Sequence, residues 1–327
     1  MFSRLGLGVG LFVGALALGW ALRRRGWLTE AQAKRVIRLT MRWLSPIVLC
    51  LSFWRLRFAG AHLAWLPVIG FAVSSSTLLP AWWYARRAQL SPPQTGSFLT
   101  CALFSNLGFL GAFIAFALYG EAAYGLAMLY LVYFSPSFYL LGFAIAKRFG
   151  RGTSVPRHSL TGEDLAGSVG RGRQSSTADA EPMEELRLYP FLGLLTGVVL
   201  NLAHLPRPAI CEPINRLLIP IDTAIYLTAV GTYLHVESLG PWRQAGLAMS
   251  AIKFCYSPLI GWALVWLIHL EGLPRFIVLL QTSMPVAISP LMLTMLFGLD
   301  RRLATALFLM TTCLAIPWLF VYVPLVR

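Results

Sequence analysis

The sequence predicts an all-α membrane protein with ten transmembrane helices, arranged as two inverted five-helix repeats in which helices 4 and 9 are broken. Three observations predict this fold class. Of the 327 residues, 57% are hydrophobic and only 12% are charged, which is too apolar for a core surrounded by water. Ten apolar stretches approach the length of about 20 residues that bridges the hydrocarbon of a bilayer. The two halves of the chain also share landmarks at a constant offset.

The ten expected spans follow one another along the whole chain. Each is a run of apolar side chains with few charges, and they are expected at residues 5–22, 36–53, 63–84, 97–118, 122–146, 188–204, 217–234, 245–267, 276–297 and 303–323. The first run is too long for a signal peptide. Basic residues follow it rather than precede it, so we expect it to be retained as a span.

Two segments between spans have a polar character. Between the first two spans, Thr29 with Gln32 at its third following position predicts the capped start of a short interfacial helix. Residues 149–187 are rich in Gly, Ser, Arg and acidic residues and are expected to be a flexible cytoplasmic linker. This linker separates a first five-helix repeat at 1–148 from a second at 188–327.

The net charge of +14 does not indicate a nucleic-acid partner, because the basic residues are distributed by span end. They gather after alternate spans, as Arg86 and Arg87 do after the third and Lys147 and Arg148 after the fifth. Lys and Arg accumulate on the cytoplasmic side of membrane proteins. We therefore expect a multi-pass protein of the cell (inner) membrane with both termini on the non-cytoplasmic side.

The chain shows no pattern for a metal, a cofactor or an enzyme. Its five cysteines are scattered without the paired spacing of a metal site, and its five histidines have no repeating acidic neighbour. Catalysis inside a membrane needs paired carboxylates, a His with an acidic partner or a Ser/Lys dyad. No such constellation is evident, so we expect a protein that is not an enzyme.

An internal repeat follows from landmarks that recur 178 positions apart. Arg38-Leu39 matches Arg216-Leu217, Pro80 matches Pro258, and Gly120 matches Gly298. Because each repeat has an odd number of spans, the second repeat is inverted relative to the first. Inverted repeats are a mark of secondary transporters, which bind substrate near midplane where helices are interrupted.

The order of several motifs resembles the auxin efflux carrier family over nearly the whole chain outside the linker. These motifs are GWALRRRGWLTEAQAKRVIRLTMRWLSPIVL in the first half, NLGFLGAF followed by LYGE, Lys253 five residues before Pro258, and SMPVAISPLMLTMLFGLD in the ninth span. The family includes bacterial permeases for malate and malonate and the plant PIN-type exporters. The resemblance implies two inverted five-helix repeats, broken fourth and ninth helices that cross, a moving transport bundle, a homodimer and small organic anions as substrates.

The resemblance also assigns residues at the two breaks. Asn106 matches the amide of the first break, and Pro285 and Pro290 lie at the second. The family often has a proline where this chain has Phe113, so we expect the first break to depend on Gly108 and Gly111. The internal offset places Met284 opposite Asn106.

The breaks are the expected substrate site. A helix that starts in mid-bilayer presents free N–H groups and the positive end of its dipole, which hold a carboxylate without a cationic side chain. Asn106 adds an amide donor or caps the helix, and Gln281 and Ser283 approach from the other side as further donors or as helix-packing residues. The expected substrate-binding residues are Asn106, Gly108, Gly111, Gln281, Ser283, Pro285 and Pro290.

Two ionisable residues fall within spans, where a charge is costly and usually functional. Asp222 lies in the seventh span and either carries a coupling proton, pairs with Lys253 or is exposed at the outer face. Lys253 lies in the eighth span. If it does not pair with Asp222, it is expected to extend its ammonium to the cytoplasmic interface. The sequence thus favours a permease or efflux carrier that moves a small organic anion by alternating access. A channel-like protein or a transport-silent sensor on the same fold is the alternative.

Overall fold

The computed structural model describes residues 1–56, 61–150, 183–233 and 239–326, and in these ranges it is all-α apart from one isolated β-bridge. The helices of the first half are α1 (Phe2–Arg24), α2 (Glu30–Leu39), α3 (Ser45–Arg55), α4 (Trp65–Ser76), α5 (Leu78–Arg87), α6 (Pro92–Leu103), α7 (Ala112–Tyr119), α8 (Glu121–Tyr130), α9 (Phe134–Ser137) and α10 (Phe143–Phe149). Those of the second half are α11 (Met183–Leu202), α12 (Cys211–Gly231), α13 (Arg243–Ala251), α14 (Ser257–Ile268), α15 (Gly272–Thr282), α16 (Ser289–Phe297) and α17 (Arg301–Val326).

Several of these helices join end to end through single π-turns or 3-10 turns. The π-turns are η1 (Thr40–Leu44), η3 (Leu107–Gly111), η5 (Phe138–Gly142) and η8 (Ile252–Tyr256). Six of the resulting segments in the described ranges are long and apolar enough to cross a membrane: Phe2–Arg24, Glu30–Arg55, Trp65–Arg87, Glu121–Phe149, Gly240–Ile268 and Arg301–Val326. The chain therefore forms the many apolar helices that its composition predicts.

Helices also occupy the other four expected spans. Two of these spans are α11 and α12, and the other two are interrupted, with α6 followed by η3 and α7, and α15 followed by α16. Most of the expected linker lies outside the described residues, and α11 begins at Met183 within the stretch assigned to it. The expected interfacial helix is α2, and its capping box at Thr29 and Gln32 is confirmed.

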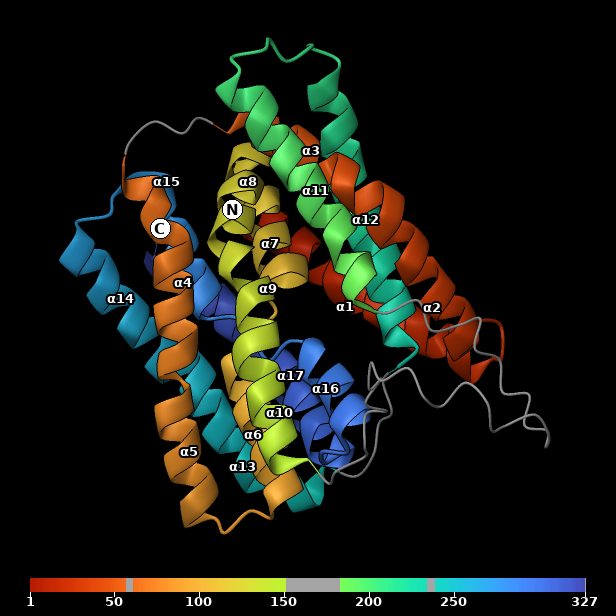
Figure 1. The fold of residues 1–327 in the computed structure, drawn as a ribbon, viewed down its shortest axis with the longest axis vertical. Helices are drawn as coiled ribbons and strands as arrows, with labels where there is room; N and C mark the ends of the chain where they lie inside the picture. The colour runs from red at the N-terminus through yellow and green to blue at the C-terminus, as the bar shows by residue number, and fades with distance from the viewer. Residues whose placement is uncertain (57–60, 151–182, 234–238, 327) are drawn as a thin grey trace, which may run out of the picture.

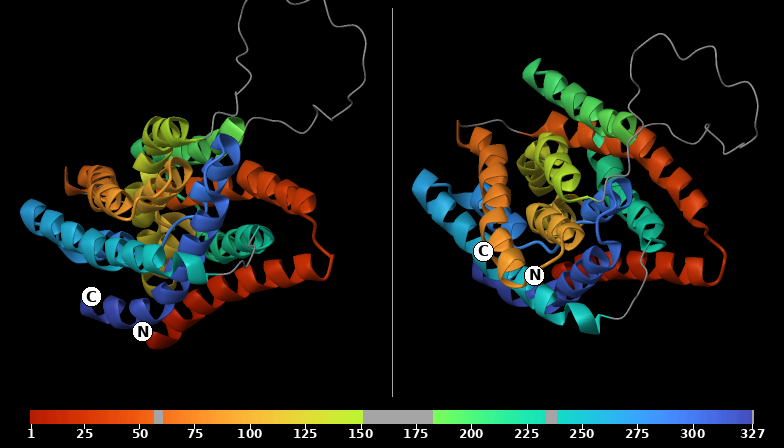
Figure 2. Two further views of the ribbon diagram at one scale, coloured as in Figure 1. Left: turned by 90° about the horizontal axis from the view of Figure 1, so that it is seen from below. Right: turned by 60° about the horizontal axis from the view of Figure 1, so that its bottom comes forward.

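The helices form two groups. In one group α3 packs along α11, and α1 and α2 pack along α12, while the other contains α4–α10 and α13–α17. Figures 1 and 2 show α3, α11 and α12 to one side of α8–α10 and α6. The groups meet where α7 contacts α1 and α8 contacts α3.

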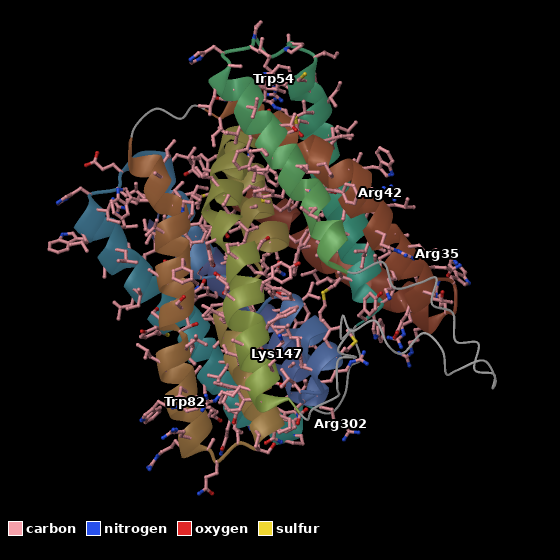
Figure 3. All side chains as sticks on the ribbon, in the orientation of Figure 1. Arg35, Arg42, Trp54, Trp82, Lys147 and Arg302 are labelled. Carbon is pink, nitrogen blue, oxygen red and sulfur yellow. The ribbon has the colours of Figure 1, made fainter. Side chains whose placement is uncertain are left out.

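Several basic residues lie together at one end of the molecule. Figure 3 shows Lys147 and Arg302 at one end and Trp54 at the other. Arg86 and Arg87, at the end of α5, belong to the same end as Lys147, because α5, α6 and α10 pack together there. This arrangement follows the distribution of basic residues along the sequence.

An ion-pair network joins the two groups of helices beside α3 and the start of α8. Glu121, whose side chain is only 1% exposed, accepts hydrogen bonds from Arg207 Nη2 at 2.6 Å, Arg55 Nη1 at 3.3 Å and Asn215 Nδ2 at 2.5 Å. Arg55 also pairs with Glu212 at 2.7 Å. Glu121 on α8 belongs to one group, and its partners on α3 and α12 belong to the other. The network therefore links the two groups at the end of α3 that carries Arg55.

Candidate functional site

The two interrupted helices cross and bond to each other at their breaks. The N–H of Asn106 donates to the carbonyl oxygen of Pro285 at 2.8 Å, and the N–H of Ala287 donates to that of Phe104 at 3.0 Å. These bonds flank an antiparallel bridge between Ser105 and Val286. Backbone that leaves a helix in apolar surroundings needs new partners for its polar groups. Each break supplies the partners that the other lacks, and we call this pairing the crossover.

Local sequence explains why the second helix breaks here. Pro285 has no N–H to give to a helix, and Pro290 stands in the first turn of α16, where a missing N–H costs little. At the first break, φ and ψ of Phe104 are extended, and η3 restarts the helix after Asn106. Sequence and structure agree on the second break, whereas the first break lies at residues 104–106, before Gly108 and Gly111, on which it was expected to depend.

The glycines of the first break serve close packing rather than an unusual backbone angle. A Cβ on Gly111 would collide with Oε1 of Gln281, so any larger residue there requires the Gln281 side chain to shift. A Cβ on Gly108 would lie 3.3 Å from Leu131, a tight but less severe contact. Both glycines belong to η3, just after the break rather than in it.

The offset of 178 positions does not hold at the crossover. In the bridge, the N–H of Asn106 bonds to Pro285 of the second half, and the N–H of Ala287 makes the equivalent bond to the first half. The residue of the second half that corresponds to Asn106 is therefore Ala287 rather than Met284. The physical reason is helix length: η3 and α7 contain 5 and 8 residues, whereas α16 has 9. The extra π-turn of the first half shifts the register.

A cavity of about 260 Å³ lies beside the crossover. Asn106, Leu107 and Gly108 line it from the start of η3, and Ile288 and Ser289 line it from the start of α16. Within the described residues, Nδ2 of Asn106 and Oγ of Ser289 are buried without a hydrogen-bond partner. Two helix starts thus line one cavity, and each carries a buried polar group without a partner, which is an arrangement suited to an anionic group.

Another part of the cavity wall carries a carboxylate. Asp222 on α12 is 4% exposed, and its Oδ1 accepts a hydrogen bond from Oγ of Ser45 at 2.8 Å. One helical turn further along α12, Tyr226 stacks on Phe109 with ring centroids 3.8 Å apart. Asp222 therefore faces the cavity next to an aromatic surface.

The rest of the cavity wall is largely apolar. It comes from α2, η1, α3, α8, the 3-10 turn before α9, α9, α11, the second break and α16, through Ile37, Met41, Leu49, Tyr124, Met128, Leu131, Val132, Phe134, Ser135, Pro190, Phe191, Leu194, Ala287 and Met292. No Lys, Arg or His of the described ranges belongs to this lining. The cavity combines a few polar groups with an apolar body, as small-molecule sites usually do.

Lys253 lies at the crossover but does not line the cavity. It is fully buried in η8, and its ammonium donates to the carbonyl oxygen of Ala102 at 2.6 Å and to Oγ of Ser105 at 2.8 Å. Ala102 is in the last turn of α6, where the helix dipole favours a cation. In the described ranges no ion pair joins Lys253 to Asp222, whose partner is Ser45.

The structure separates the candidate residues of the second break from the cavity. Gln281 donates to the carbonyl oxygen of Ala127 at 3.3 Å, and Ser283 bonds the carbonyl of Leu280 in its own helix end. The carbonyl oxygen of Pro285 accepts from the N–H of Asn106, and Pro290 lies in the first turn of α16. Asn106, Gly108 and Asp222 are the predicted residues that line the cavity.

Sequence reasoning did not assign Ser45, Ser289, Phe109 or Tyr226 to the site. Ser289 carries a readable signal, because Ser followed by Pro290 is typical of a helix start. Phe109 and Tyr226 come from opposite halves of the chain, and no local pattern marks their stacking.

Comparison with known proteins agrees with a membrane protein of this kind. Residues 10–323 match the family model described as membrane transport protein. An uncharacterized transporter of Methanothermobacter thermautotrophicus is 23% identical over 301 residues, which cover 91% of each chain. An uncharacterized transporter of Methanocaldococcus jannaschii is 25% identical over 235 residues, covering 68% of this chain and 66% of that protein.

Proposed function

Because this chain belongs to the auxin efflux carrier family of membrane transport proteins, we propose that it is a secondary carrier that moves a small organic anion across the membrane by alternating access. The substrate binds by a carboxylate in the cavity beside the crossover. One observation carries this proposal: the buried Nδ2 of Asn106 and Oγ of Ser289 lack partners among the described residues and stand at two helix N-termini that line one cavity.

The proposed architecture is ten spans in two inverted five-helix repeats. The crossover supports it, because each half of the chain contributes one interrupted helix to the bridge. Interrupted helices from opposite repeats that meet near the substrate site are characteristic of secondary transporters. The basic end that contains Lys147 and Arg302 is then cytoplasmic, and both termini are non-cytoplasmic. A homodimer in the cell membrane completes the proposal on family resemblance.

The grouping of helices supplies a route for alternating access. The cavity is lined by α2, α3, α11 and α12 of one group and by α8, η3 and α16, which pack with the other. Relative motion of the groups would open the cavity first to one side of the membrane and then to the other. The ion-pair network around Glu121 joins the two groups at the end that carries Arg55, so motion of the groups would have to break or rearrange it.

Asp222 is the proposed site for a coupling proton. The titratable residues that line the cavity with it are Tyr124 and Tyr226, and its hydrogen-bond donor is Ser45. Asp222→Asn removes the titratable carboxyl while keeping its shape, so substrate flux in this variant should lose its dependence on pH. Flux that is indifferent to pH in both proteins would exclude Asp222 from coupling.

Transport by protein reconstituted in liposomes tests the function. Uptake of labelled dicarboxylates or aromatic acids should be saturable, and Asn106→Leu should reduce it strongly by removing the amide donor. Gln244→Leu, which changes an exposed amide on α13, is the matched control and should leave uptake unchanged. Unchanged uptake in folded Asn106→Leu protein would reject the site. Conductance above carrier rates would favour a channel, and folded protein that neither conducts nor transports would favour a sensor.

A further inference from the structure

The cavity beside the crossover offers its ligand two polar regions of opposite character. The first contains Nδ2 of Asn106 and Oγ of Ser289 at the starts of η3 and α16. The second contains the carboxylate of Asp222. A ligand that satisfies only the first region leaves the second without an ionic partner.

When it is ionised, Asp222 has no positive partner among the described residues that line the cavity. Its side chain is buried, its hydrogen bond comes from the neutral hydroxyl of Ser45, and no described Lys, Arg or His lines the cavity. A buried charge is stable only when it is paired or hydrogen-bonded by several groups. Lys253, the buried cation closest in sequence, is occupied by Ala102 and Ser105.

The wall next to Asp222 is suited to a flat apolar group. Tyr226 lies four residues beyond Asp222 on α12 and therefore on the same helix face. Its ring stacks on Phe109, and Met128 and Met292 also line the cavity. Aromatic faces attract both apolar rings and organic cations, and methionine adapts to irregular apolar shapes.

We propose that the substrate is a zwitterion, an amino acid with an apolar or aromatic body. Its carboxylate binds at Asn106 and Ser289, its ammonium at Asp222, and its body against Phe109 and Tyr226. This inference rests on the carboxylate site of the proposed function, but it replaces a substrate of net negative charge with a zwitterion that carries both a carboxylate and an ammonium. The volume of about 260 Å³ lies just below the usual ~300–1,000 Å³ of small-molecule pockets and suits a small metabolite.

The charge of Asp222 argues against two other classes of acid. The second carboxylate of a dicarboxylate would share the cavity with the Asp222 carboxylate, and two like charges at close range repel each other. A simple monocarboxylate avoids that repulsion but leaves Asp222 without an ionic partner. An amino acid carries one charged group suited to each of the two regions.

Binding of three probes with the same ring to the purified full-length protein tests the inference. Phenylalanine, as its α- and β-isomers, has both charged groups, 3-phenylpropionate has only the carboxylate, and phenethylamine only the ammonium. By titration calorimetry, the better phenylalanine isomer should bind about tenfold more tightly than either single-charge probe, as expected for one additional charged hydrogen bond. Equal or tighter binding of 3-phenylpropionate would overturn the inference.

Variants separate this inference from the proposed function. Asp222→Asn should abolish the preference for phenylalanine over 3-phenylpropionate, whereas Glu271→Gln, at an exposed acid, should preserve it. If Asp222→Asn does not fold, Ser45→Ala should reduce the preference by loosening the carboxylate. If the folded variant still binds phenylalanine more tightly than 3-phenylpropionate, the zwitterion proposal is overturned. Saturable transport of 3-phenylpropionate without phenylalanine would overturn the inference alone, and absence of any carboxylate transport would overturn the proposed function.

Discussion

Asn106 and Pro285 are joined by a backbone hydrogen bond of 2.8 Å that links two helices from opposite halves of the chain. Asn106 gives its N–H to the crossover and still has an unused side-chain Nδ2 at the cavity. The same residue therefore holds the broken helices together and presents a donor to a ligand. Substitutions near it need controls that separate loss of folding from loss of binding.

Because Gly111 lies so close to Gln281, adding one methyl group at residue 111 should have a strong effect on stability. Gly111→Ala would force Oε1 of Gln281 away and should lower the free energy of unfolding by about 1–3 kcal/mol, the usual cost of overpacking. Thermal unfolding in detergent measures the change. Gly14→Ala on α1 is the control, because its Cβ meets no atom within 4 Å in the described structure. If this contact is the cause, the double variant Gly111→Ala/Gln281→Ala should recover the stability that Gly111→Ala loses.

The buried carboxylate of Glu121 should be the strongest single support of the ion-pair network. Glu121→Gln leaves Arg207, whose side chain is 12% exposed, without its charged partner and should cost about 3 kcal/mol. Denaturant titration of the reconstituted or detergent-solubilised protein measures this loss. Glu212→Gln, at a carboxylate that is 37% exposed, should have a much smaller effect because solvent screens that pair. Equal losses in the two variants would contradict the assignment.

Glu212 should give the network a pH dependence at acidic pH. The hydrogen bond from Arg55 lowers the pKa of the Glu212 carboxyl below its ordinary value of 4.5. A group whose pKa is lower in the folded state contributes stability above its unfolded pKa and loses it as pH falls through the folded pKa. The difference in melting temperature between wild type and Glu212→Gln should therefore be present at pH 6 and disappear well below pH 4.5. A difference that is constant over this range would exclude Glu212 as its source.

Much of the secondary structure was predictable because its causes are local. Apolar run length and the Thr29–Gln32 capping box predicted helices, and both are confirmed. Pro285 and Pro290 predicted the second break through chemistry that acts within a few residues. The arrangement of ten spans in two inverted repeats stays a proposal, and the landmarks that suggested it do not show how the helices pack.

The cavity could be predicted only in part, because its walls come from distant segments. Asn106 and Asp222 stood out as polar residues within apolar spans, and both line the cavity. The partner of Asp222 is Ser45 from the opposite half, which no local pattern identifies. The register of the crossover was missed because a π-turn adds residues that hydrophobic periodicity does not reveal.

Lys253 should stabilise the crossover through α6 rather than act inside the cavity. Lys253→Met keeps most of the side-chain volume but removes the donor to the carbonyl of Ala102 and the hydroxyl of Ser105. Loss of these charged hydrogen bonds should lower the free energy of unfolding by about 1.5–3 kcal/mol. Lys147→Met, at an exposed lysine near the end of α10, is the control and should be nearly neutral. Because Ser105 precedes Asn106, displacement of Ser105 should also weaken substrate binding. A Lys253→Met variant that is destabilised yet binds substrate with wild-type affinity would show that Lys253 supports folding without supporting the binding site.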